Sequence, residues 1–489
     1  MKLKLGLAVA GVIFLPITIW ALGDKLPAKL NFSGFASLQE GQIVSGGGGE
    51  GYHSKPNAVT DHVWIQELYT GVNVQALFDN LPIETNIGIE LRVGNEYPRY
   101  YPDLGKSRRL YFYPYLSRAD LRAAFGDEQY PFLSVGLGYF PFKYNKEVRN
   151  LGEYLFRSGT YPQYLITEFD FPMNRLVGLH LSGNVNEYLN WNVLATTNIE
   201  WTALGDFNLS AIVSGKPSIP FIEVGAGVSF TSLFSVNDDF TSPKVPASSY
   251  LDGNGDTLHY TFAGTKLMGR ATLNPQAFFS ENRTLSPNDL KLYAEVAVLG
   301  VKNYPVSIDT FTRYDDVAGR IPFMFGFNWP THPLMSWPAV GAFIFSDAAN
   351  RISTKTFIGS GTGLITGFAF WLLDKKFKIR TGLDILSLEV EYFKNQYPND
   401  MSPIVYDNQP IPLSSLRNMK NSSNMNYHKD DWKVSLYGKK TIKDHFHITF
   451  QFARDHMRWY KMDFGEMDWR ETLRSPEDWA WTIKLGYSL

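Results

Sequence analysis

Cysteine is absent from this chain of 489 residues. Its absence excludes a disulfide framework, a thiolate zinc site, thiol catalysis and a lipid anchor on a lipobox cysteine. An excess of charge of one sign is lacking too, because 46 basic and 48 acidic residues leave a net charge of -2. No global electrostatic field would draw the chain to nucleic acid, so we expect no nucleic-acid partner.

Local catalytic motifs are also missing. The sequence has no G-x-S-x-G elbow, no P-loop and no H-E-x-x-H helix. Serine, histidine and acidic residues are present, but no local spacing joins them into a catalytic group. We therefore predict no catalytic site, no enzyme activity and no cofactor.

Long hydrophobic runs are rare, and the clearest one lies at the N-terminus. Lys2 and Lys4 precede an apolar stretch over 5–20, and Ala21 offers a small residue for cleavage. This pattern predicts a signal peptide over 1–21 and a mature chain over 22–489. The alternative is an uncleaved anchor, although the run is shorter than the ~20 residues of a membrane span.

The next most apolar run, at 359–373, is short and broken by glycines. We find no convincing amphipathic helical domain elsewhere. After export, therefore, we expect no helix to hold the protein in a bilayer.

Aromatic residues are abundant at 15 %, with 35 Phe, 27 Tyr and 12 Trp. Flat rings favour strands, where they pack on a pleated, half-buried surface. Tyr and Trp also suit a membrane interface, where one end of the ring is apolar and the other is hydrated.

Apolar and polar residues alternate in many segments. At 83–94, Ile87 and Leu91 fall on one face while Glu90 and Arg92 fall on the other. A strand separates these two sets completely, whereas a helix would mix them. Similar segments lie at 30–38, 63–78, 108–125, 132–140, 175–183, 190–203, 207–214, 222–234, 258–273, 290–298, 321–329, 376–393, 432–436, 446–452 and 479–489.

The connections between these segments fall into two classes. Short stretches rich in Gly, Pro, Asn and Asp join some neighbours, and longer polar stretches lie at 41–61, 235–256 and 396–430. This mixture predicts an all-β fold, a closed antiparallel transmembrane β-barrel of about 16–18 strands with short turns at one rim and long loops at the other. A soluble sandwich would show the same alternation. The N-terminal signal, the strand lengths and the rings near segment ends favour the barrel.

The last segment carries the closest resemblance to a known class. Every second residue of this segment is an aromatic or large aliphatic residue. These residues are Trp479, Trp481, Ile483, Leu485, Tyr487 and Leu489. This pattern resembles the terminal strand of bacterial outer-membrane β-barrel proteins, which usually ends in Phe or Trp rather than Leu. The resemblance implies a bacterial outer-membrane location, lipid contact, recognition by the barrel-assembly machinery and a porin-like channel. It leaves a homo-oligomer open.

One group of candidate pore-lining residues combines arginines with tyrosines. Arginines on a lumen wall would attract anions, and a row of tyrosines on one strand face could guide sugars. The alternative is a girdle of rings at the membrane interface beside loop charges. The candidates are Arg92, Arg109, Tyr111, Tyr113, Tyr115, Arg118 and Arg122.

A second group lies in the mixed-charge stretch 143–164, which follows a predicted strand. Folded into the lumen, it would narrow the pore, and opposed acidic and basic rows would create a transverse field. The alternative is an ordinary external loop. The candidates are Lys146, Glu147, Arg149, Glu153 and Arg157.

Two metal patterns are weak. Asp252, Asn254 and Asp256 space oxygen ligands as calcium loops do, but Thr257 stands where such loops require glycine, so a plain polar turn is favoured. His445 and His447 lie two residues apart, and lumen-facing polar residues are the simpler interpretation than a transition-metal pair.

These observations favour a porin-like channel for small hydrophilic solutes, with anions or sugars as candidates. Two alternatives stay open. One is an outer-membrane adhesin or scaffold that binds polysaccharide or protein through long surface loops. The other is a secreted all-β glycan-active protein.

Overall fold

The computed structural model describes most strands and both long helices of the chain. The described residues are 28–45, 63–78, 82–95, 110–127, 129–156, 174–197, 206–216, 221–235, 249–251, 257–259, 264–278, 285–298, 301, 321–344, 354–377, 382–395, 430–454, 458–463, 466–471 and 479–489. The predicted signal peptide lies outside them.

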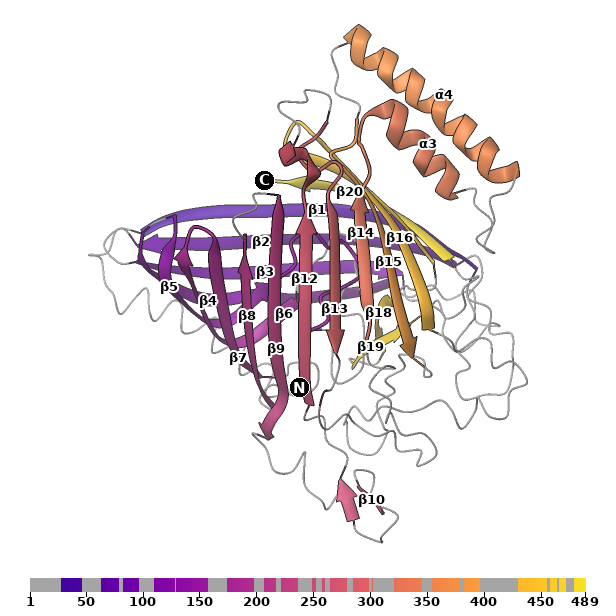
Figure 1. Cartoon of the computed structure of the whole chain (residues 1–489). Helices are drawn as coiled ribbons and strands as arrows, with labels where there is room; N and C mark the ends of the chain where they lie inside the picture. The colour runs from indigo at the N-terminus through magenta and orange to yellow at the C-terminus, as the bar shows by residue number, and fades with distance from the viewer. Residues whose placement is uncertain are drawn as a thin grey trace.

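Sixteen antiparallel strands form a closed barrel (Figure 1). In ring order they are β1 (Ala28–Ser45), β2 (Val63–Phe78), β3 (Ile83–Asn95), β4 (Leu110–Gly126), β5 (Pro131–Phe142), β6 (Asn174–Asn186), β7 (Leu189–Thr197), β8 (Asp206–Gly215), β9 (Ile222–Ser235), β12 (Gly264–Leu273), β13 (Leu292–Val298), β14 (Phe323–Asn328), β15 (Ile385–Asn395), β16 (Asp430–Ile442), β17 (Phe446–Arg454) and β20 (Trp479–Ser488). Two short pairs, β10 (Ser249–Leu251) with β11 (Thr257–His259) and β18 (Arg458–Asp463) with β19 (Glu466–Glu471), stand apart from the ring. The predicted closed barrel is confirmed.

The ring closes where the last strand meets the first. β20 pairs with β1 from Phe35 opposite Ser488 to Ser45 opposite Trp479, and it pairs with β17 on its other edge. Because the ring is closed, it has no free strand edge. Backbone N–H and C=O groups within the hydrocarbon of a membrane need partners within the protein, since no water is available there.

Alternation sets the two faces of the wall, as the sequence predicts. Phe32 on β1 is 68 % exposed and pairs with Val74 on β2, while Ser37 and Gln39 are buried on the opposite face. On β3, Ile89 is exposed and Glu90 is buried. The outer face is therefore apolar, and the polar residues point into the barrel.

The two rims differ in their connections. Turns 187–188 and 443–445 are short, and both lie at the rim where β20 ends. The long connections lie at the other rim, largely outside the described residues. The predicted long connection at 41–61 begins too early, because β1 continues to Ser45.

One connection at the short-turn rim contradicts the prediction. Between β14 and β15 the chain forms α3 (Pro333–Ile344) and α4 (Thr354–Phe377), a helical hairpin beside the barrel (Figure 1). The predicted strand 376–393 is thus wrong at its start, because α4 runs to Phe377 and β15 begins at Ile385. A second connection there, between β12 and β13, contains the short 3-10 helix η4 (Pro275–Phe278). Among the described residues, no helix is long and apolar enough to cross a membrane.

Candidate pore constriction

The chain turns inward after β5 and follows the inner wall as the segment 143–156. β5 is the fifth strand of the ring, whereas β13 and β15 are the eleventh and thirteenth. Polar atoms of the segment reach inward-facing side chains on these distant strands, including Glu295 and Glu389. The segment therefore passes through the barrel interior along the half of the ring between β5 and β16.

Glu389 on β15 holds the middle of the segment. Its carboxylate accepts hydrogen bonds from the backbone N–H groups of Arg149, Asn150 and Leu151, at 2.5, 2.8 and 3.0 Å. The hydroxyl of Tyr293 also donates to it, at 2.8 Å. Hydrogen bonds to a charged acceptor are stronger than neutral ones, so this carboxylate is a strong docking point for the segment.

Glu295 on β13 holds both ends of the same segment. Its carboxylate accepts hydrogen bonds from the side chain of Asn145 at 2.9 Å and from the backbone N–H of Tyr154 at 2.8 Å. The Tyr154 hydroxyl in turn donates to Glu391 on β15, at 2.9 Å. The carboxylates of Glu295, Glu389 and Glu391 thus accept hydrogen bonds from buried donors of the segment. Leaving these donors unpaired would destabilise the folded protein.

Apolar packing completes the attachment. Val148, Leu151 and Leu155 of the segment belong to one buried cluster with Leu194 on β7 and Ile212 on β8. Val148 and Leu151 have no exposed surface. The segment therefore fills one side of the barrel interior, as a packed part of the structure.

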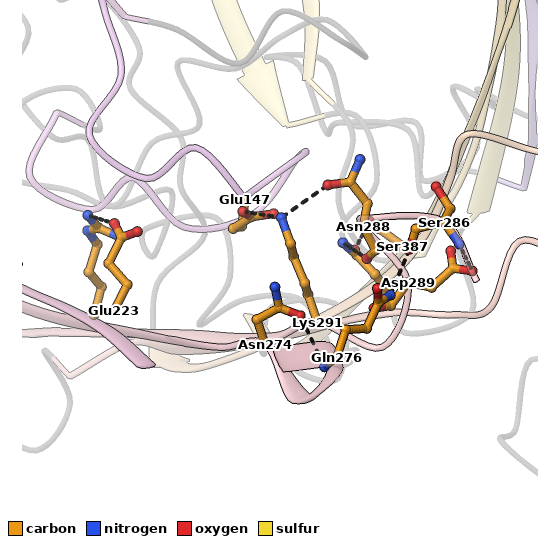
Figure 2. Close-up of polar contacts among 11 residues, drawn as sticks. Glu147, Glu223, Asn274, Gln276, Ser286, Asn288, Asp289, Lys291 and Ser387 are labelled. Carbon is orange, nitrogen blue, oxygen red and sulfur yellow. Dashed lines mark hydrogen bonds and ion pairs between the residues drawn. The ribbon is translucent and has the colours of Figure 1, made fainter. Parts of the chain in front are cut away.

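An ion pair fixes the segment near the short-turn rim. Figure 2 shows Glu147 and Lys291 pointing toward one another. Glu147 Oε1 and Lys291 Nζ are 3.0 Å apart. The same ammonium donates to Asn288 in the connection between β12 and β13, at 3.0 Å. Each side chain is less than one-fifth exposed, so water screens this pair only in part.

The strand β4 carries a row of inward charges on the other side of the ring. It is the fourth strand, opposite the twelfth, β14. Asp120 accepts from Arg118 Nη2 at 3.2 Å and from Arg122 Nε at 2.7 Å. The side chains of Arg118 and Arg122 are 22 % and 36 % exposed, and that of Asp120 is buried. The two cations share Asp120, Arg122 also lies 4.0 Å from Glu84 on β3, and both arginines reach water.

A basic–aromatic cluster lies beside this row on β2, β3, β4 and β6. The Arg92 guanidinium lies 4.7 Å from the centroid of the Tyr69 ring, and that of Arg175 lies 5.2 Å from the centroid of Tyr115. Arg175 pairs with Glu90 at 2.6 Å. The side chain of Arg92 is only 7 % exposed, so this cluster chiefly stiffens the wall.

Known proteins resemble this chain in structure and not in sequence. The sequence matches no protein-family model and no curated protein. In structure it is similar to OprB of Pseudomonas putida (11% identity, 94% of each chain covered, TM-score 0.45). It is also similar to a mutant Rh. blastica porin (5% identity, 94% and 100% covered, TM-score 0.39) and to the outer membrane channel DcaP of Acinetobacter baumannii (10%, 94% and 97% covered, TM-score 0.38).

The closed ring, its apolar outer face and its polar interior decide the class, because a barrel of this kind satisfies every backbone group inside hydrocarbon. The chain is a membrane-spanning β-barrel of porin-like architecture. Sixteen strands are enough for a porin to enclose an aqueous lumen.

Several of the predicted pore-lining residues lie together inside the porin-like barrel, and others lie outside the described residues. Arg92, Tyr115, Arg118 and Arg122 lie on β3 and β4 as described above. Lys146, Glu147, Arg149 and Glu153 lie in the inward segment, and Lys146 is exposed. In the backbone register, Tyr111 pairs with Gly94 and Tyr113 with Arg92. Arg109, Arg157 and the acidic loop Asp252, Asn254 and Asp256 lie outside the described residues.

The two histidines do not share a strand face. His445 lies in the turn 443–445, where its ring nitrogen lies 2.9 Å from the Ser488 carbonyl, and His447 lies on β17. Among the residues that the structure describes, no group of three or more His, Asp or Glu could hold a metal ion.

The inward segment of the porin-like barrel contains a strongly perturbed carboxyl. Burial, and then the nearby Glu295 carboxylate, raise the pKa of Glu153 to about 8. Lys143 opposes this shift, and the Asn145 N–H donates to Glu153 at 2.6 Å. Glu153 thus binds a proton more readily than an ordinary glutamate does.

Sequence reasoning missed the wall residues that hold the segment, chiefly Glu295, Glu389 and Arg175. Alternation places glutamates on inward faces, but it does not say which of them meets a segment more than a hundred residues away in the chain. No local signal would have found these contacts.

Proposed function

We propose that this barrel is a channel through which small hydrophilic solutes diffuse across the outer membrane, with anions and sugars favoured. The observation that supports this function is the inward segment 143–156, docked on Glu295 and Glu389 inside a closed barrel. A protein that used its barrel only as an anchor would have no need to build a packed constriction inside it.

The charge distribution favours anions and polar neutral solutes. On the β13 and β15 side, the carboxylates of Glu295, Glu389 and Glu391 are occupied by donors of the segment. On the β4 side, Arg118 and Arg122 are partly exposed and share Asp120, and Arg122 also lies 4.0 Å from Glu84. A permeating solute therefore meets guanidinium donors, which bind carboxylate, phosphate and hydroxyl oxygens well.

Export and assembly belong to the same proposal. The predicted signal peptide over 1–21 would direct the mature chain, 22–489, across the inner membrane. β20, which closes the ring against β1, would present the terminal pattern to the barrel-assembly machinery.

The experiment is planar-bilayer recording of the mature chain refolded in detergent. Heat-modifiable gel migration first establishes that the barrel is folded. We expect stepwise conductance and, in a KCl gradient, a reversal potential that shows anion preference. A folded barrel that inserts without conducting would refute the channel and leave the adhesin or scaffold. Conductance with cation preference would refute only the solute class.

A further inference from the structure

The hairpin of α3 and α4 stands on the outer side of the barrel wall. Leu386 on β15 and Leu436 on β16 lie on the outward face, since Ser387 and Ser435 beside them face inward toward other polar groups. Yet these two leucines are buried, because Val340 and neighbouring residues of α3 pack over them. Elsewhere on the described part of the ring, large outward side chains such as Phe32 and Ile89 are exposed. The hairpin therefore occupies the place that lipid would otherwise fill, near the short-turn rim (Figure 1).

The two helices touch through glycines. Gly359, Gly363 and Gly367 recur at every fourth residue of α4. A Cβ added at Gly363 would lie 2.2 Å from the Trp337 carbonyl oxygen of α3, and one added at Gly367 would lie 2.4 Å from that of Pro333. The backbones are thus in direct contact, and beside them the Trp337 ring of α3 stacks on the Phe370 ring of α4.

The large apolar side chains of α4 point away from α3 and from the barrel. Ile365 is 72 % exposed, the most of this set, and the others are about half exposed. The set is Ile358, Leu364, Ile365, Phe368, Leu372 and Leu373. A helix pair in water would bury such residues in its interface and expose polar ones. This pair buries glycines and exposes its apolar face, which is the arrangement of helices that associate in lipid.

The polar groups of α4 fit the same surroundings. The hydroxyls of Thr362 and Thr366 donate to carbonyl oxygens of their own helix, Gly359 and Thr362, both at 2.9 Å, so they require no water. Near the C-terminal end, the Lys375 ammonium lies 4.2 Å from the centroid of the Trp371 ring. Tryptophan and lysine are the residues that anchor helices at the level of lipid headgroups.

We propose that the α3–α4 hairpin lies in the lipid around the barrel at the short-turn rim, with the apolar face of α4 against acyl chains and Lys375 at the headgroups. α3 packs on the outer face of β15 and β16, and α4 lies on the far side of α3 (Figure 1). No described helix is long and apolar enough to cross the bilayer. The exposed apolar side of α4 therefore lies beside a lipid-facing wall, so the occupant is lipid rather than a soluble partner. This placement holds whether or not the barrel conducts.

Single cysteines can test this placement without background, because the chain has none of its own. Ile365→Cys reports on α4. Ile89→Cys, on the exposed outer face of β3, is the lipid control, and Glu187→Cys, in a short turn of the same rim, is the water control. Each full-length variant is labelled with an environment-sensitive fluorophore and folded into vesicles of phosphatidylethanolamine and phosphatidylglycerol. Heat-modifiable migration verifies folding, and Leu372→Cys gives a second site on the same face.

The readout is quenching by brominated acyl chains and by iodide present on both sides of the membrane. We expect the label at Ile365 to be quenched by brominated lipid at least twofold more than the label at Glu187, and to resist iodide as the label at Ile89 does. Quenching by iodide to the extent seen at Glu187 would place α4 in water and overturn the proposal. Protection from both quenchers would mean that protein, such as a second copy of the chain, covers the face, which would overturn it too.

Discussion

The carboxylate of Glu389 on β15 accepts a hydrogen bond from the backbone N–H of Asn150 at 2.8 Å, although 239 residues separate the two. The N–H groups on either side of Asn150 donate to the same carboxylate. One wall side chain thus fixes three consecutive backbone groups of the inward segment. The contact holds the middle of the segment against the inner wall of the barrel.

Replacing Glu389 by glutamine should loosen the segment. The amide offers one acceptor oxygen and turns an NH2 toward backbone N–H groups, so at least one buried donor loses its partner. We expect docking of the segment to weaken by about 1.5–3 kcal/mol. In planar bilayers the Glu389→Gln channel should show larger and noisier single-channel currents.

The control for this change is Glu187→Gln, in an exposed turn. It should migrate and conduct as wild type does. A Glu389→Gln channel with unaltered current and noise would mean that the segment does not set the width of the lumen.

The raised pKa of Glu153 predicts that the constriction opens as pH rises. With the segment docked, this carboxyl has a pKa of about 8, against an ordinary value of 4.5. Between these values the docked form holds a proton that the released form has lost, so stability of docking is fully present below pH 4.5 and falls as pH rises toward 8. Conductance measured from pH 5 to 9 should therefore increase.

Glu153→Gln mimics the protonated side chain and should keep the low-pH conductance across this range. The matched control is Glu147→Gln in the same segment, which removes only the ion pair with Lys291. That variant should keep the wild-type pH profile. If Glu153→Gln follows the wild-type profile as well, another group governs the dependence.

Period-two alternation predicted the strands, while the N-terminal signal, the strand lengths and the rings near segment ends favoured a closed barrel over a sandwich. The predicted segment 63–78 coincides with β2, and 83–94 falls one residue short of β3. Both strands have one face against lipid and one against the polar interior. Apolar residues therefore indicate the outer face, and polar residues indicate the inner face. The stretch 143–164 could be singled out by its charges, but its docking depends on Glu295 and Glu389, which only the closed ring brings near.

The helical hairpin escaped prediction for a different reason. The glycines at 359, 363 and 367 break the apolar run when hydropathy alone is considered. Their spacing of four residues is the informative feature, because it places all three on one helix face. Since α4 is apolar on its other faces as well, it lacks the polar side by which amphipathic helices are found.

Arg118 and Arg122 should determine the charge preference of the channel. Replacing both by alanine removes two partly exposed cations and leaves Asp120 without its two ion-pair partners on β4. The reversal potential in a KCl gradient should then move toward cation preference, by a shift that shrinks at high salt because screening weakens the field.

Lys375→Ala is the matched control, because it removes one cation on α4, outside the barrel. It should leave the reversal potential unchanged. If the double arginine variant also keeps the wild-type potential, permeating ions do not meet this row.

Gly138 on β5 should be irreplaceable by alanine, whereas Gly269 on β12 should tolerate it. Gly138 has a φ of +126°, and an added Cβ would lie 2.2 Å from the Ala119 carbonyl oxygen of β4. Backbone strain of this kind costs about 1–3 kcal/mol before the clash is counted. At Gly269 the nearest atom to an added Cβ, on Val296, is 3.8 Å away. Refolding at increasing urea, followed by unheated gel migration, should show Gly138→Ala losing its folded band first. Because Gly138 pairs with Asp120, equal urea tolerance in the two variants would mean that the register beside the Arg118 and Arg122 row differs from the one described.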